Sequence, residues 1–432
     1  MKTYVYALIA FLSAAPALGQ ESVIQTMMNA VSADSLMTYD RALESAAGYY
    51  SRVSFTPGND STAQYLLRSF KRFPALATVA FDTFYVSAAA VPYNTKPMVN
   101  VYGVLPGKKD STRAVVIGAH FDSYAGKEST WPTGWRTIHA PGADDNASGV
   151  SAVVEMARVF STYATAGFSN DYSLIFAAFN CEEAGMAYPV YLYGSDHFSA
   201  LLKGKGMTLA AMINLDMIGY NTRLTADIVS DSASLPIGTT AVDVNSRYAL
   251  GLTMNAPPFV YATYSDHSTF WGKQYPAILI IEHAPPNRSG DAYAANMLYH
   301  SSADTSGALN PELMKRTTQL ALATAATYAV QKSASDVQTV SVLPPSSSAL
   351  GQNYPNPFNP ATRIPFTVAA AQHIRIVVYD VLGRVVATLV DRMMMQGSYA
   401  IDWDAHAAQT GTYFCRMTGE KFSDVKKILI TK

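Results

Sequence analysis

The chain has 432 residues, of which 49% are hydrophobic and 15% are charged. This composition supplies enough apolar side chain for a large core and excludes an intrinsically disordered chain. The 31 basic and 32 acidic residues give a formal net charge of -1, so the chain lacks the basic surface that nucleic-acid-binding proteins need. Its two cysteines, Cys181 and Cys415, exclude a disulfide-rich scaffold and a cysteine-based zinc module.

The N-terminus has the pattern of a secretory signal peptide over residues 1–19. Lys2 supplies the positive charge, and Val5 to Ala14 form an apolar run about half as long as a membrane-spanning helix. The small residues of Ala17-Leu18-Gly19 then offer a cleavage site. The competing interpretations are an N-terminal membrane anchor and a buried helix. No later apolar run reaches about 18 residues, so no transmembrane segment is expected in the mature protein.

Residues 20–335 are predicted to form one α/β domain. Strand-like and helical runs alternate along it, which predicts a mostly parallel central sheet flanked by helices. Residues 20–95 are expected to form an N-terminal extension of helices and loops that packs on this sheet. The strand-like runs are residues 114–119, 172–179, 211–215 and 277–281, and the helical runs are residues 144–163 and 314–329.

A seam rich in proline and serine follows the α/β domain. We interpret residues 336–350 as a linker, because helical patterning ends before them and they contain Pro344, Pro345 and the three consecutive serines 346–348. The remaining residues, 351–432, contain short strand-like runs separated by turn residues, which predicts a small β-sandwich. These runs are residues 374–379, 385–390, 399–403, 411–416 and 426–430.

Acidic and imidazole side chains follow the predicted strands of the α/β domain. Sites in such sheets form at the carboxyl ends of the strands. Carboxylate and imidazole are ligands that zinc accepts, and a water molecule held between two metal ions becomes a strong nucleophile near neutral pH. Five ligands with one shared carboxylate would make two metal sites. The candidate residues are His120, Asp122, Asp144, Asp145, Glu182, Glu183, Asp216, His300 and Asp304.

Each of these motifs alone has an ordinary structural explanation. The His120-Phe-Asp122 motif is more often structural than metal-binding, and Asp144-Asp145 before a helix is a natural N-terminal cap. Glu182-Glu183 after a strand is usually a solvated turn. Asp216 differs, because an acid within an apolar strand needs a partner for its charge. It is the combination of four such clusters in one α/β domain that favours a metal site.

The same motifs resemble a known family. Gly-Ala-His-Phe-Asp-Ser, Pro-Gly-Ala-Asp-Asp-Asn-Ala-Ser-Gly, Asn-Cys-Glu-Glu-Ala-Gly, Asn-Leu-Asp-Met-Ile-Gly and Tyr-His-Ser-Ser-Ala-Asp-Thr occur in this order within residues 95–330. They are similar in sequence and spacing to the co-catalytic zinc aminopeptidases of metallopeptidase family twenty-eight. The resemblance implies the zinc exopeptidase fold and two zinc ions as cofactors.

The resemblance also implies a set of metal ligands. It places one zinc ion on His120 and Asp216 and the other on Glu183 and His300. Asp144 is the implied bridge between them, and a cis peptide bond is implied between Asp144 and Asp145.

The remaining implied roles concern catalysis and support of the ligands. Glu182 is expected to be the general base, and the hydroxyl of Tyr299 is expected to stabilise the oxyanion. Asp122 is expected to orient His120, as partners of metal-bound imidazoles usually do. We also expect Asp304 to orient His300.

The last module resembles the C-terminal sorting domain of type IX secretion. The similarity covers about residues 348–432 and rests on Gln352 to Pro360, Tyr379 to Arg384 and Lys426 to Ile430. It implies the type IX secretion machinery as a partner and a location outside the cell or on the outer-membrane surface. An ordinary adhesion or spacer sandwich is the alternative.

Three classes of function are therefore open. The first is a secreted zinc exopeptidase, with aminopeptidase action on the N-termini of peptides or proteins as the leading form and carboxypeptidase or dipeptidase action as alternatives. The second is a glutaminyl-cyclase-like transferase on the same fold, which typically binds one zinc ion. The third is a non-catalytic surface binding protein. Five ligands together with Glu182 favour the first.

Overall fold

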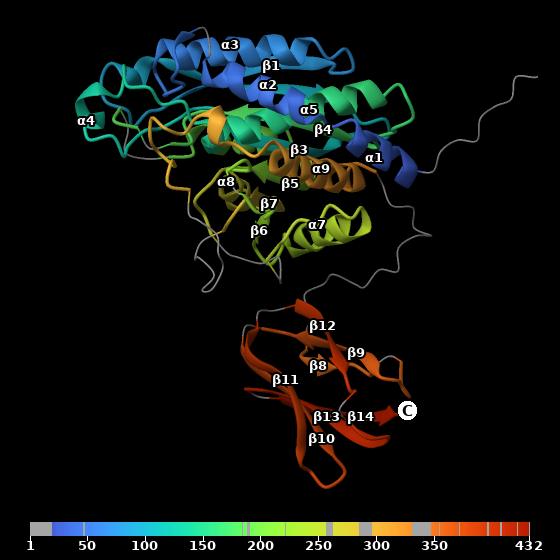
Figure 1. Cartoon of the computed structure of the whole chain (residues 1–432). Coiled ribbons are helices and arrows are strands. Elements are labelled where there is room, and N and C mark those ends of the chain that lie inside the picture. The colour runs from blue at the N-terminus through green and yellow to red at the C-terminus, as the bar shows by residue number, and fades with distance from the viewer. Residues whose placement is uncertain are drawn as a thin grey trace, which may run out of the picture. The chain divides into compact units, whose positions relative to one another are not determined.

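The structure is a computed structural model. It describes residues 20–45, 48–183, 185–187, 191–220, 222–255, 262–284, 296–330, 347–353, 355–370, 372–394, 397–406, 408–420 and 422–431. The predicted signal peptide, residues 1–19, and residues 336–346 of the predicted linker lie outside these ranges. The chain divides into two compact units between residues 331 and 332, the first with a sheet and helices and the second built of strands (Figure 1).

A seven-stranded sheet forms the centre of the first unit, in the order β1-β2-β4-β3-β5-β7-β6. The inner strands β4, β3, β5 and β7 run parallel, whereas β1, β2 and β6 pair antiparallel with their neighbours. The α/β prediction is confirmed, but the sheet is mixed rather than mostly parallel. The strands are β1 Thr78–Tyr85, β2 Pro97–Leu105, β3 Asp110–His120, β4 Tyr172–Phe179, β5 Thr208–Leu215, β6 Asp227–Ser230 and β7 Ala277–Ile281.

Strand β1 corrects the expectation for residues 20–95. This segment was expected to contain only helices and loops, yet β1 is an edge strand of the sheet and pairs with β2 along its full length. Its side chains are mostly half-buried or exposed, because it lies at the edge. The strong apolar run that identifies an inner strand is therefore missing from its sequence.

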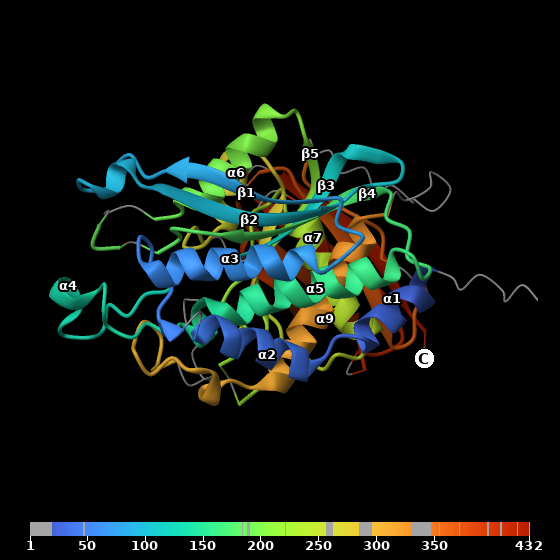
Figure 2. The ribbon, with the colours of Figure 1, turned by 90° about the horizontal axis from the view of Figure 1, so that it is seen from above.

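Helices cover both faces of the sheet. Helices α1, α2, α3, α5 and α9 lie on one face, and α6 lies on the other (Figure 2). None of the helices in the described ranges is long and apolar enough to cross a membrane. The helical segments of this unit are α1 Gln20–Asn29, α2 Ala33–Glu44, α3 Pro57–Lys71, η2 Tyr93–Thr95, α4 Trp131–Gly134, η3 Ala143–Ser148, α5 Gly149–Tyr163, α6 Tyr193–Gly204, α7 Leu235–Arg247, α8 His267–Gly272, η4 Ser306–Ala308 and α9 Pro311–Tyr328.

Strand β3 shows why the inner strands read as continuous apolar runs. Val115, Ile117 and Ala119 pack into the core beneath α5 and α9, whereas Ala114 and Val116 pack into the core beneath α6 and α8. Because both faces are covered, successive side chains are all buried and the two-residue alternation of a half-exposed strand is absent. The last residue of this buried strand is His120.

The second unit is a sandwich of a four-stranded sheet, β11-β10-β13-β14, and a three-stranded sheet, β12-β9-β8. Its core contains Phe358, Trp403 and Tyr413. The ring centroids of Phe358 and Trp403 lie 5.6 Å apart. The predicted β-sandwich is present, with β8 and β9 in addition to the five predicted strands. The strands are β8 Ala349–Leu350, β9 Ala361–Val368, β10 Gln372–Asp380, β11 Val385–Met394, β12 Gly397–Asp404, β13 Gly411–Gly419 and β14 Phe422–Ile430.

Candidate metal centre

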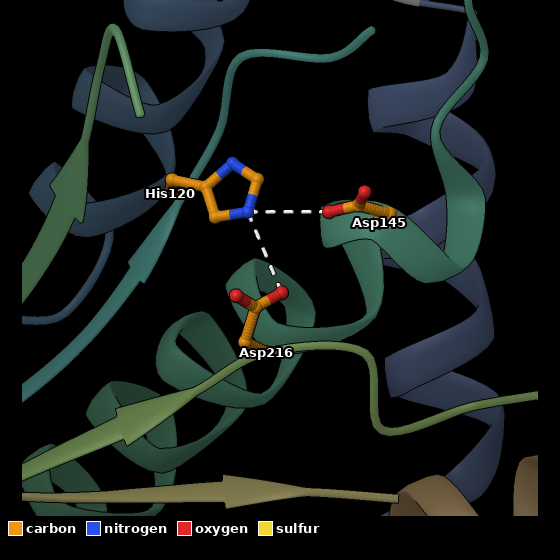
Figure 3. A group of neighbouring side chains, drawn as sticks. All are labelled: His120, Asp145 and Asp216. Carbon is orange, nitrogen blue, oxygen red and sulfur yellow. Dashed lines mark ion pairs between the residues drawn. The ribbon is translucent and has the colours of Figure 1, made fainter. Parts of the chain in front are cut away.

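The carboxyl ends of three parallel strands bring the predicted residues to one edge of the sheet. His120 ends β3, Glu182 and Glu183 follow β4, and Asp216 follows β5 directly. Strand β3 pairs in parallel with both β4 and β5, so these three ends lie side by side. The loop that leads into α5 supplies Asp145 to the same edge (Figure 3).

The first cluster consists of His120, Asp145 and Asp216 (Figure 3). The Nε2 atom of His120 lies 3.2 Å from Oδ1 of Asp145 and 3.4 Å from Oδ1 of Asp216. All three residues are buried. A nitrogen and two carboxylate oxygens thus converge on one point, which is a donor set that suits zinc.

Asp216 is oriented by two neighbours that sequence reasoning did not identify. The hydroxyl of Ser265 donates to Oδ2 of Asp216 at 2.6 Å, and the side-chain amide of Asn214 donates to that hydroxyl at 2.8 Å. Oδ1 of Asp216 is buried and accepts no hydrogen bond within the described part of the chain. Oδ2 of Asp216 is therefore held by a hydrogen bond from Ser265, while Oδ1 faces His120. The sequence signal was present, since Asn214 and Asp216 are two residues apart and project to the same side.

The second cluster consists of Asp145, Glu183 and His300. Nε2 of His300 lies 2.8 Å from Oε1 of Glu183 and 3.0 Å from Oδ2 of Asp145. The backbone of His300 has φ = +58°, a left-handed conformation that is uncommon for residues other than glycine. The edge of the Tyr124 ring contacts the His300 ring, with the centroids 4.7 Å apart.

Asp145, rather than Asp144, lies between the two clusters. Its Oδ1 faces His120 and its Oδ2 faces His300, so its carboxylate is shared. The carboxylate of Asp144 points elsewhere and accepts hydrogen bonds from the amides of Gly219, at 2.8 Å, and Tyr220, at 3.1 Å. The carboxylate shared by the two clusters is thus that of Asp145, one residue after the predicted bridge Asp144.

The local backbone explains this difference. Asp145 has φ = -110° and ψ = 91°, so the chain is not helical there and adjacent side chains project in different directions. The cis peptide bond is also displaced by one residue from the expected position, to Asp145–Asn146. Two neighbouring aspartates are equivalent in composition, and only the backbone path distinguishes them.

Burial and charge perturb the acids and imidazoles of both clusters. Although burial alone lowers the pKa of His300, Glu183 and Asp145 raise it to about 10. Burial raises the pKa of Glu183 to about 7, and it raises the pKa of Asp145 as well, but hydrogen bonds to both histidines hold that pKa well below its usual value. The buried carboxylates of the two clusters outnumber the two histidines that can donate hydrogen bonds or positive charge to them. A bound divalent cation would satisfy them, so the residues present fit a metal pair.

Glu182 and Glu183 are held by Asp122. The carboxylate of Asp122 accepts hydrogen bonds from the amide of Glu182, at 3.1 Å, and from the amide of Glu183, at 3.2 Å. Nδ1 of His120 lies 3.3 Å from the carbonyl oxygen of Asp122 and 3.7 Å from its nearer carboxylate oxygen. Asp122 therefore contacts His120 through its main chain and connects it to the glutamate pair. Burial raises the pKa of Glu182 well above its ordinary value.

Asp304 does not contact His300 in the way that was expected. Its carboxylate accepts hydrogen bonds from the amide of Asp144 at 2.9 Å and from the amide of Asp145 at 3.1 Å. The expectation that Asp304 orients His300 is therefore wrong. Asp304 instead fixes the backbone at Asp144 and Asp145, and its own carbonyl oxygen accepts from the amide of Ala143 at 3.0 Å.

Tyr299 stacks on the ring of His300, the predicted ligand that follows it. The rings of Tyr299 and His300 have centroids 3.6 Å apart and planes inclined by 22°. The Nζ atom of Lys127 lies 5.3 Å from the centroid of the Tyr299 ring. Burial raises the pKa of Tyr299, so its hydroxyl keeps its proton and can act as a hydrogen-bond donor.

Comparison with known proteins identifies the first unit. Residues 100–325, more than half of the chain, match the model of peptidase family M28. The chain belongs to peptidase family M28. Residues 352–431 match the secretion system C-terminal sorting domain, which directs a protein to the cell surface or the extracellular space. The family and the sorting domain predicted from the sequence motifs are thus both confirmed.

Relatives and solved structures agree with this assignment. A probable leucine aminopeptidase of Trichophyton verrucosum is 26% identical over 293 residues, which cover 67% of this chain and 71% of the relative. A probable zinc metalloprotease of Pyrenophora teres f. teres is 29% identical over 197 residues, which cover 43% of this chain. The aligned parts span only 38%, 34% and 21% of three such metalloproteases.

Two solved structures share the fold. The Legionella pneumophila LapA aminopeptidase superposes with a TM-score of 0.57 at 20% identity, covering 77% of this chain and 81% of that protein. An Acidobacteriales bacterium glutaminyl cyclase superposes with a TM-score of 0.55 at 20% identity, covering 75% of this chain and 99% of that protein. At these identities the similarity concerns the fold alone.

Proposed function

We propose that the protein is a secreted aminopeptidase with two zinc ions that share the carboxylate of Asp145. His120 and Asp216 would hold one ion, and Glu183 and His300 would hold the other. The observation that carries this proposal is the placement of the two Asp145 oxygens, 3.2 Å from His120 and 3.0 Å from His300. Bound zinc would polarise the scissile carbonyl and lower the pKa of a coordinated water molecule.

Glu182 is the proposed general base. Its carboxylate takes a proton from the attacking water molecule and gives it to the leaving amine. The raised pKa of this buried acid supports the role, because the group must hold the proton between the two transfers. The amide of Glu182 donates a hydrogen bond to the carboxylate of Asp122 at 3.1 Å, which fixes the backbone of Glu182.

Tyr299 is the proposed hydrogen-bond donor to the oxyanion that develops on the scissile carbonyl. Its raised pKa keeps the hydroxyl protonated, and its stacking on His300 fixes the ring beside the second cluster. The other residues act indirectly. Ser265 orients the carboxylate of Asp216, Asp122 holds the backbone of Glu182 and Glu183, and Asp304 holds the backbone of Asp144 and Asp145.

The substrate's free amine is the first testable consequence. Buried acids dominate the centre, so a positively charged N-terminus is attracted to it, whereas acetylation removes this charge and adds bulk. We expect peptides with a free N-terminus and an amidated C-terminus to be hydrolysed, and N-acetylated peptides with a free C-terminus to resist hydrolysis. Mass spectrometry of the products from a panel of such peptides measures both. Equal cleavage of the acetylated series would instead indicate carboxypeptidase or endopeptidase action.

A glutaminyl-cyclase-like reaction is the second candidate, because proteins with that name share the fold. The two clusters around Asp145 favour a metal pair and thus a peptidase. A peptide with N-terminal glutamine distinguishes the reactions, since cyclisation releases ammonia and leaves the peptide bonds intact, whereas hydrolysis releases free glutamine. Ammonia release without hydrolysis of any free-amine peptide would support the cyclase.

Removal of the sorting domain tests the proposal that the first unit carries out catalysis and the second unit serves only for secretion. All proposed site residues lie in the first unit, and the sandwich has its own core. We therefore expect a chain that ends at Ser335 to fold, bind zinc and keep most of its turnover, while it is no longer delivered to the cell surface. Activity of the purified protein and cell fractionation measure the two effects. A folded, zinc-loaded but inactive truncated protein would show that the sandwich contributes to catalysis.

A further inference from the structure

A buried arginine lies beneath the candidate metal centre, outside the part of the chain that matches the family model. Arg52 precedes α3 and is fully buried. Its guanidinium group donates hydrogen bonds to main-chain carbonyl oxygens rather than to a carboxylate. The acceptors are the carbonyl oxygens of Phe121, at 2.8 Å, Gly142, at 2.7 Å, Leu43, at 3.5 Å, and Pro141.

Three of these carbonyl groups belong to two loops, one that follows His120 and one that leads into η3 and Asp145, whereas that of Leu43 lies in α2. Phe121 directly follows His120, whereas Pro141 and Gly142 lie shortly before Asp145. One planar guanidinium group therefore joins two loops that are about twenty residues apart in sequence. Its rigid fork of donors is suited to such a fixed arrangement in a way that the ammonium group of lysine is not.

The segment between Pro141 and Asp145 is held from both sides. Arg52 binds its carbonyl oxygens, and the carboxylate of Asp304 binds the amides of Asp144 and Asp145. Both sets of hydrogen bonds are charge-assisted and so stronger than neutral ones. The path is also tight, because Gly142 has φ = +54° and a Cβ atom there would lie 2.4 Å from the carbonyl oxygen of Asp145.

The same N-terminal segment makes further hydrogen bonds to the loop that follows His120. The amide of Arg52 donates to the hydroxyl of Ser123 at 3.0 Å, and the hydroxyl of Ser54 donates to the carboxylate of Asp122 at 3.2 Å. Asn59 donates to the carbonyl oxygen of Arg52 at 2.8 Å, which fixes the arginine itself. The segment thus contacts the loop after His120 through two further side chains.

The charge of Arg52 is balanced by acids around it. Asp40 on α2 is fully buried, and neither of its carboxylate oxygens accepts a hydrogen bond from the described residues. Loss of the arginine would remove the buried counter-charge of this carboxylate and so disfavour its ionised form. Burial lowers the pKa of the Arg52 guanidinium, and the nearby acids Asp40, Asp304, Asp122 and Asp145 oppose this shift.

We propose that Arg52 is a positioning residue of the metal centre, which sets the placement of Asp145 relative to His120 by joining their loops. The proposal rests on the metal pair of the proposed function. It also makes the segment around Arg52, before the family-matched region, a part of the site rather than an accessory layer.

The test uses the full chain with the substitutions Arg52→Gln and Arg52→Lys. Arg158→Gln is the matched control, because Arg158 also donates to a main-chain carbonyl, that of Ala30 at 2.7 Å, and neutralises the buried Glu155 at 2.6 Å. Each protein is stripped of metal and titrated with zinc against a chromophoric chelator. Absorption spectra of the cobalt-loaded proteins report ligand geometry, and thermal unfolding reports stability.

We expect Arg52→Gln to bind zinc about 10–100-fold more weakly, as loss of an orienting partner usually does. Its cobalt spectrum should change, and kcat should fall at saturating zinc with little change in KM. Arg52→Lys, which keeps the charge without the fork, should be intermediate. Arg158→Gln should lose thermal stability only.

Wild-type zinc affinity and cobalt spectrum in a folded Arg52→Lys or Arg52→Gln protein would overturn the proposal. If Arg52→Gln does not fold, Arg52→Lys decides, and failure of both to fold even with zinc would assign Arg52 to folding instead. A wild-type protein that binds two metal ions but hydrolyses no peptide would contradict the proposed function while leaving these metal readouts valid.

Discussion

Replacing Glu182 by glutamine should abolish turnover while both zinc ions stay bound. The amide is nearly the same size as the carboxylate but cannot take a proton from water. Loss of a general base costs about 10²–10⁴-fold in rate. The loss here should lie at the upper end or beyond, because the same group would also deliver the proton to the leaving amine. Initial rates together with the zinc content of the purified protein measure the effect, and excess zinc should restore nothing.

Glu183→Gln is the matched control, since it makes the same chemical change one residue away. Oε1 of Glu183 lies 2.8 Å from Nε2 of His300, in the second cluster. The substitution should therefore weaken the ion held with His300, and added zinc should partly restore activity. A zinc-depleted but rescuable Glu182→Gln beside a fully loaded and inactive Glu183→Gln would reverse the two roles.

Asp145→Asn should have an even broader effect on metal content, because Asp145 serves both clusters. The substitution removes the shared negative charge and leaves at most one oxygen to face the two histidines. Since loss of a mere orienting partner costs about 10–100-fold in metal affinity, loss of the shared ligand should exceed that at both positions. We expect a protein with no more than one bound zinc ion and negligible activity, measured by metal analysis after dialysis and by initial rates at several zinc concentrations.

Asp144→Asn distinguishes Asp145 as the shared ligand from Asp144, the shared ligand that the sequence analysis predicts. Asp144 accepts from the amides of Gly219 and Tyr220, and an asparagine oxygen can still accept those hydrogen bonds. The protein should therefore keep two zinc ions, with an affinity lowered only as far as losing the hydrogen bond from Asn296 to Asp144 disturbs the segment. If Asp144→Asn lost both ions while Asp145→Asn kept them, Asp144 would be the bridge after all.

A site residue could be predicted from the sequence where an acidic or imidazole side chain directly follows a buried strand. His120 and Asp216 follow apolar runs that can only be inner strands, and parallel neighbours bring such ends together. Strand β1 was missed for the opposite reason, because an edge strand needs no continuous apolar run. The antiparallel pairing of the outer strands likewise leaves little trace in composition.

Residue roles within a short segment were harder to predict. Asp144 and Asp145 are alike in charge and size, and a non-helical turn decides which one faces the histidines. The sequence analysis predicts that Asp304 orients His300, whereas its carboxylate binds backbone amides about 160 residues earlier in the chain. Arg52 carried no recognisable motif, since its partners are main-chain carbonyl groups that any sequence provides.

The shared carboxylate of Asp145 has a thermodynamic consequence for the proposed pair of ions. An ion held by His120 would orient the carboxylate of Asp145, whose other oxygen faces His300. The free energies of filling the two positions would therefore not be independent. By linkage, whatever factor the first ion imposes on the affinity of the second, the second imposes on the first. Loading and exchange of zinc would then be properties of the pair, set by one aspartate side chain.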